Sequence, residues 1–173
     1  LAFVTDISPA DFGGTGAADY PRTSAQGNTV GWEQAVGGSV RDRNSTVDAR
    51  VAGIHFVNNP STLDYRFDLP AAGDYNLRCA MGDYNHVHGP MRLEIFDTTT
   101  SLGRLCNDKT MSATQRFFDA SDVERTAAAW PADNVAVTKT FATTICRFRI
   151  GGPASDISPI VPAYVEAIAF DEL

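Results

Sequence analysis

Apolar and polar residues alternate with a period of two through the middle of the chain, which is the pattern of a β-strand with one buried face. Apolar side chains occupy every second position between residues 63 and 69, and Asp or Arg fills the positions between them. Segments of similar character predict further strands over 74–83, 91–97, 101–108, 143–152 and 164–173.

The inward phase of these strands predicts the core. We expect ten side chains to point between two sheets: Tyr65, Phe67, Leu69, Leu77, Cys79, Met81, Leu93, Ile95, Phe148 and Ile150. A slip of one residue would instead bury Arg66, Asp68, Arg78 and Glu94, at several kcal/mol for each unpaired charge. The outward phase is charged, and it predicts either a solvated, salt-bridged surface or a docking surface: Arg66, Asp68, Arg78, Arg92, Glu94, Arg147 and Arg149.

Helical periodicity is nearly absent. Residues 121–130 are compatible with one short helix, with Ser121 or Asp122 as its N-cap and Pro131 as its end. Short strands separated by Gly, Pro, Asn and Asp turns predict an all-β fold. We expect a two-sheet antiparallel β-sandwich of the jelly-roll type. It forms a single domain over residues 1–173, with a Gly-rich, less regular portion at 1–40 and a short strand at Leu1–Thr5.

Composition and charge exclude several classes of protein. Of the 173 residues, 43% are hydrophobic and 20% are charged, which is the balance of a folded globular chain. The formal net charge of −7 disfavours nucleic acids and anionic membranes as partners. No apolar run approaches the roughly 18 residues of a membrane span. The chain begins at Leu1 without a charged leader, so we expect a mature or trimmed product.

The three cysteines, Cys79, Cys106 and Cys146, have neither a CxxC pair nor zinc spacing. We expect Cys79 and Cys146 to be buried thiols, and the alternative is a disulfide between them. The sequon at Asn44 matters only in a secretory pathway with glycosylation, which the sequence does not establish.

One polar loop follows the strand at 74–83 and is the main candidate for chemistry. It carries Asp83, Tyr84, Asn85, His86 and His88. His86 and His88, with Asp83 close by, could supply part of the ligand set of a metal site. Only a residue from elsewhere in the chain, such as His55, would complete the set. The alternative is a loop whose histidines hydrogen-bond with backbone or water. We expect no cofactor, and the sequence leaves a structural calcium ion open without indicating one.

Nothing in the chain assembles into a catalytic site. The sequence has no GxSxG and no P-loop, and no pair of carboxylates is singled out, so an enzyme is not expected. Binding a sugar needs aromatic faces beside planar polar groups. The aromatic residues outside the clear strand cores are Tyr20, Trp32, Tyr84 and Trp130. The alternative for each tryptophan is a buried position in the core, under a loop.

Four segments in order resemble a known family: GWE (31–33), RDR (41–43), RFDLPAAGDYNLRCAMGD (66–83) and HGPM (88–91). They look like the galactose-binding-like β-sandwich domains of bacterial carbohydrate-active enzymes, most closely the non-catalytic module of rhamnogalacturonan acetylesterase-type enzymes. This resemblance covers about sixty residues and implies a carbohydrate-binding module-like β-sandwich. The segment at 116–150 bears a weaker resemblance to β-rich phage virion proteins.

These observations predict a non-catalytic carbohydrate-binding or adhesion module that acts outside the cell. The predicted ligand site comprises Trp32, Asp83, Tyr84, Asn85, His86, His88 and Trp130. The alternative is a structural or decoration subunit of a phage virion or another extracellular assembly. The expected partners are accordingly a glycan, or identical or neighbouring subunits in a homo-oligomer or lattice.

Overall fold

The structure is a computed structural model that describes residues 18, 20–23, 27–34, 40–42, 53–58, 62–151 and 157–167. For 40–42, 53–58 and 157–167 only the backbone is described. The strand expected at Leu1–Thr5 and the sequon at Asn44 lie outside these residues.

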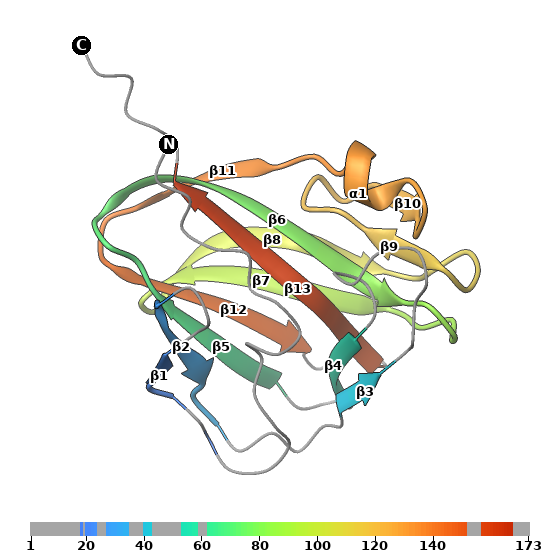
Figure 1. Ribbon diagram of the computed structural model, residues 1–173, viewed down its shortest axis with the longest axis horizontal. Helices are drawn as coiled ribbons and strands as arrows, with labels where there is room; N and C mark the ends of the chain where they lie inside the picture. Colours follow the sequence, from blue (N-terminus) through green and yellow to red (C-terminus); the bar gives the residue numbers. More distant parts are fainter. Residues whose placement is uncertain are drawn as a thin grey trace.

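The strands form two antiparallel sheets in separate layers (Figure 1). The first, here called the β12 sheet, has the order β1 (Arg22–Thr23), β2 (Thr29–Trp32), β5 (Thr62–Asp68), β12 (Ile145–Gly151), β7 (Met91–Asp97) and β8 (Thr100–Lys109). The second, the β6 sheet, has the order β10 (Glu124–Thr126), β9 (Arg116–Phe118), β6 (Gly73–Asp83), β13 (Ile157–Ala167), β4 (Gly53–Asn58) and β3 (Val40–Asp42), with β11 (Val137–Phe141) also paired to β6. This arrangement confirms the predicted two-sheet β-sandwich.

The predicted strands appear close to their expected bounds. The segments at 63–70, 74–83, 91–97, 101–108 and 143–152 correspond to β5, β6, β7, β8 and β12. The last strand, β13, begins at Ile157, earlier than the expected start at residue 164. Within the described ranges, no helix has the length and apolar character of a membrane span.

The period-two pattern predicts the core correctly. All ten side chains expected between the sheets are buried. They form one cluster with other buried residues, including Trp32, Met91 and Phe141. The three cysteines are buried, free thiols, which favours the first interpretation over a disulfide. Burial raises the pKa of all three thiols, that of Cys106 to about 12.

The short helix is where the sequence prediction was wrong. Helix α1 spans Trp130–Asp133, so Pro131 lies in its first turn and does not end it. Proline is tolerated there because the first amides of a helix have no partner within the helix. The segment expected to be helical contains a turn and then the strand β10.

The side chain of Asp119 explains why residues 121–126 are not helical. Asp119 is fully buried, and its carboxylate accepts hydrogen bonds from the backbone amides of Ser121, Val123 and Val135, from the Ser121 hydroxyl and from Arg125. Burial alone would raise the pKa of Asp119, but these hydrogen bonds lower it below its usual value. A buried carboxylate that collects nearby amides offers the backbone an alternative to a helix.

A second, smaller core lies on the outer side of the β6 sheet. Trp130, Phe117, Ala80 and Ala127 form this cluster, and Tyr84 packs against it. The second half of β6 is therefore buried on both faces. Gly82 lies here, and a Cβ at this position would come 2.1 Å from the carbonyl oxygen of Arg116, so the close approach of β9 requires a glycine.

Candidate functional site

The predicted loop site is organised around Asp83, at the end of β6. Asp83 is fully buried. Its carboxylate accepts a hydrogen bond from the backbone amide of Asn85 at 2.8 Å and interacts with Nε2 of His88 at 2.9 Å. The rings of His86 and His88 lie 6.0 Å apart. The Asp83 carboxylate thus stabilises the turn that follows β6.

The loop provides few accessible groups for a ligand. Asn85 and His86 are exposed, whereas His88 and Tyr84 are half-buried. Among the residues that the structure describes, no group of three metal-ligating side chains comes together. A ligand-binding role for this loop stays a prediction.

Both tryptophans of the predicted site are interior residues. Trp32 is fully buried and packs edge to face against Tyr65, with ring centroids 5.1 Å apart. Trp130 is also fully buried, and its Nε1 donates to the carbonyl oxygen of Cys79 at 3.0 Å. Neither ring offers a face at the surface for a sugar, which corrects the expectation that they would stack on a ligand. Both tryptophans fill the core instead.

The outer face of the β12 sheet carries a second candidate, which we call the arginine face. It comprises the outward side chains of β5, β12, β7 and β8, together with Glu33, which follows β2. Its charged members are Glu33, Asp64, Arg66, Asp68, Arg92, Glu94, Arg104, Asp108, Arg147 and Arg149. The strand register sets Arg147 beside Arg66 and Arg149 beside both Asp64 and Glu94. Alternation along each strand therefore gathers charges that lie far apart in the sequence.

Glu33 joins two of these arginines. Its carboxylate accepts hydrogen bonds from Nε and Nη2 of Arg147, the latter at 2.8 Å. Nη1 of Arg147 donates to the carbonyl oxygen of Thr98. The same carboxylate lies 3.6 Å from Nη1 of Arg66, whose Nε donates to Asp68 at 2.7 Å. Hydrogen bonding to Glu33 raises the pKa of Arg147.

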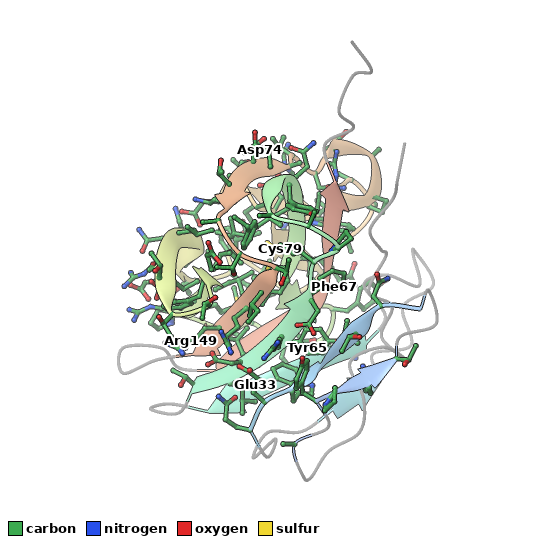
Figure 2. The ribbon with its side chains drawn as sticks, turned by 90° about the vertical axis from the view of Figure 1, so that its left-hand side faces the viewer. Glu33, Tyr65, Phe67, Asp74, Cys79 and Arg149 are labelled. Atoms are coloured by element: carbon green, nitrogen blue, oxygen red, sulfur yellow. The ribbon has the colours of Figure 1, made fainter. Side chains whose placement is uncertain are left out.

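Asp64 holds the third central arginine in a bidentate pair. Nε and Nη2 of Arg149 each donate to one Asp64 oxygen at 2.7 Å. The Asp64 side chain is only 6% exposed, while that of Arg149 is 37% exposed. Gln34 adds a second contact, because its Oε1 accepts from the Asp64 amide at 2.7 Å. Hydrogen bonding to Asp64 raises the pKa of Arg149. Figure 2 labels Arg149 and Glu33 in the same part of the molecule.

Two aromatic rings lie under guanidinium groups on this face. The Arg66 guanidinium is 4.3 Å from the ring centroid of Tyr20, whose hydroxyl donates to Asp68 at 2.7 Å. The Arg149 guanidinium is 4.3 Å from the ring centroid of Phe96. These stacked contacts favour one orientation of each guanidinium plane. One side of each ring is thereby covered.

Pairs of arginine and carboxylate side chains continue across the face to the edge strand β8. Arg92 donates to both oxygens of Asp108, at 2.7 and 2.8 Å, and Arg104 donates to Asp108 at 3.0 Å. Hydrogen bonding to Arg92 lowers the pKa of Asp108. The five arginines of this face are thus held in ion pairs, and the face presents donors and acceptors at fixed positions.

The sequence anticipates part of this surface. Arg66, Arg147 and Arg149 belong to the predicted outward phase, but their partners Glu33 and Asp64 were not singled out. Glu33 and Arg147 are separated by 114 positions in the chain. The charges on the outward phase of the strands at 63–69, 91–97 and 143–152 are the signal that points to this face.

Comparisons with known proteins give little further information. No family model matches the chain, and no curated protein matches it. Among solved structures, the chain is similar to TmCBM61 in complex with β-1,4-galactotriose, with a TM-score of 0.36 and 14% identity over 86% of this chain and 92% of that one. This likeness is too low to transfer a site or a ligand to the present chain.

Proposed function

We propose that this chain is a non-catalytic carbohydrate-binding module whose ligand lies on the arginine face, across β5, β12 and β7. The observation that carries the proposal is the bidentate Arg149–Asp64 pair, in which a partly exposed guanidinium is fixed by a buried carboxylate. Glu94, which lies beside Arg149, and Asp68, further along β5, are also partly exposed. Together they offer solvent-accessible donors and acceptors on a rigid sheet.

The chemistry of these pairs suits hydroxyl groups. A hydroxyl both donates and accepts, so two adjacent hydroxyls of a sugar can bridge a guanidinium N–H and a carboxylate oxygen. Because the ion pairs already fix the side chains, little conformational entropy is lost when a ligand binds. The resemblance of residues 66–83 to carbohydrate-binding β-sandwich domains is consistent with this assignment.

Recognition on this face depends on hydrogen bonds more than on stacking. Arg149 covers one side of Phe96, and Arg66 covers one side of Tyr20. A sugar could therefore stack only on the side of each ring that the guanidinium leaves uncovered. We expect favourable enthalpy and modest affinity, as in other interfaces dominated by hydrogen bonds.

A glycan array followed by calorimetric titration of the best binder tests the proposal. We expect Arg149→Ala to weaken binding at least about tenfold, which corresponds to about 1.4 kcal/mol. Arg78→Ala is the matched control, since Arg78 lies on the β6 sheet and donates to Asn134. Equal loss of affinity in both variants, or no binding to any glycan, contradicts the proposal.

The loop at 83–88 is a competing location for the same function. Tyr84→Ala and His86→Ala alter its half-buried and exposed rings and leave the arginine face intact. If these variants weaken glycan binding and Arg149→Ala does not, the site lies in the loop.

An assembly subunit remains the alternative function, and light scattering at high concentration tests it. Among the described residues, the exposed large hydrophobic side chains are Val87, Val123 and Val135. A stable interface usually buries a larger apolar centre. A monomer that binds a glycan supports the carbohydrate-binding module, whereas a symmetric oligomer without glycan affinity supports the assembly.

A further inference from the structure

We infer that the arginine face selects uncharged sugars and rejects glycans that carry carboxylate or sulfate groups. This inference rests on the proposed function and specifies its ligand class. A surface rich in arginine usually attracts anions, so its charges and their pairing need to be considered together.

Among the residues that the structure describes, the charges on the arginine face balance. Its five guanidiniums are those of Arg66, Arg92, Arg104, Arg147 and Arg149, and its five carboxylates are those of Glu33, Asp64, Asp68, Glu94 and Asp108. The whole chain carries a formal net charge of −7. An anionic glycan therefore meets no local positive excess on this face and a repulsive field from the rest of the molecule.

An anionic group cannot take the Nε–Nη2 edge of Arg149 without breaking an existing pair. To bind a uronate in a bidentate manner through this edge, Arg149 would have to release Asp64, which holds it through two bonds of 2.7 Å. Asp64 is only 6% exposed, so it would be left as a buried charge without its guanidinium. Removing one partner of such a pair is strongly unfavourable. Exchange of partners therefore disfavours the anion.

The accessible carboxylates of the arginine face also disfavour the binding of an anionic glycan. The side chains of Asp68 and Asp108 are 30% and 33% exposed. Glu94 lies between them along the face, beside Arg149. These oxygens accept hydrogen bonds from sugar hydroxyls but repel a carboxylate or a sulfate. The same groups that would bind a neutral sugar would thus exclude a charged one.

A glycan array that contains neutral, uronic-acid and sulfated glycans tests the selectivity directly. We expect the bound glycans to be neutral, with at least about tenfold weaker binding of their charged counterparts, or about 1.4 kcal/mol. We also expect neutral binding to change little between about 0.05 and 0.5 M salt, because no net charge is neutralised. Equal or tighter binding of acidic glycans overturns the inference and leaves the proposed function standing. Absence of any bound glycan overturns both.

A pair of charge variants locates the selectivity on the arginine face. Glu94→Gln removes one negative charge and keeps an acceptor for the Ser101 hydroxyl. Asp74→Asn makes the same change in net charge on the β6 sheet, where Asp74 accepts from Thr140 and lies far from Glu33 and Arg149 (Figure 2). We expect Glu94→Gln alone to raise the affinity for a uronic-acid glycan severalfold. An equal effect of Asp74→Asn would show that net charge, and not this face, sets the selectivity.

Discussion

Replacement of Trp130 distinguishes a core residue from a ligand-stacking residue. The indole is fully buried among Phe117, Ala80 and Ala127, so truncation to alanine removes a large buried side chain and leaves a cavity. Such changes cost about 3–5 kcal/mol. Trp130→Phe keeps most of the apolar volume but loses the hydrogen bond from Nε1 to the Cys79 carbonyl at 3.0 Å. An unsatisfied buried carbonyl costs about 1–3 kcal/mol, so this variant should be intermediate in stability.

Urea unfolding followed by far-ultraviolet circular dichroism measures these differences in the free energy of unfolding. The expected order of stability is wild type, then Trp130→Phe, then Trp130→Ala. Circular dichroism is preferred because the substitution itself removes one of the two tryptophan fluorophores. If Trp130→Ala stays within about 0.5 kcal/mol of wild type and abolishes glycan binding, the assignment of Trp130 to the core is wrong.

Three further predictions follow from burial and pKa. Leu77→Ala should lower the free energy of unfolding by about 2–5 kcal/mol. Arg78→Ala should cost less, because the half-buried Arg78 loses hydrogen bonds to Asn134 but leaves no cavity in the core, and a larger cost for Arg78→Ala than for Leu77→Ala in a denaturation series would contradict the assignment of inner and outer faces. The raised pKa of the buried cysteines, about 12 for Cys106, predicts that a thiol reagent at pH 8 labels all three only after unfolding, so labelling of the native protein would be a contrary result. The pKa of Asp119 is lower in the folded protein than the value of about 3.9 that it has in the unfolded chain, so the ionised carboxylate stabilises the fold at any pH above that value. This contribution is lost as the pH falls through the folded pKa. The stability difference between wild type and Asp119→Asn should therefore shrink from pH 6 to pH 3, and a constant difference in urea midpoint would argue against it.

The strands and the core could be predicted because the alternating positions of each strand separate apolar side chains, which must be buried, from charged side chains, which must stay outside. In β5 and β12, every inward position is apolar and most outward positions carry a charge. A slip of register would bury Arg66 or Arg147, so only one phase is acceptable. Nothing beyond the local sequence is needed to choose that phase.

The short helix and the second core could not be predicted because tertiary contacts determine them. Residues 121–126 carry an acceptable helix N-cap, but the carboxylate of nearby Asp119 accepts hydrogen bonds from their amides, and its burial beside Val135 is not encoded in the local sequence. Trp130 resembles a loop aromatic in the sequence, yet it covers the outer side of β6. Local propensity has no information about which segment will cover which face.

The candidate site also has one part that the local sequence predicts and one part that tertiary contacts determine. Alternation along β5 and β12 places Arg66, Arg147 and Arg149 on one surface, and this follows from the sequence. Their pairing with Glu33 and Asp64 depends on the register between strands that are far apart in the chain. Without that register, an arginine-rich surface does not reveal that its charges are already matched.

Chemical-shift mapping by NMR tests the central claim most directly. The protein is titrated with the neutral oligosaccharide that binds best on the array, and backbone amide shifts are followed along the chain. We expect the largest changes in β5, β12 and β7, around Arg66, Glu94 and Arg149, and small changes in β6 and β11. Changes concentrated in residues 83–88, or an absence of changes at saturating sugar, would contradict binding on the arginine face.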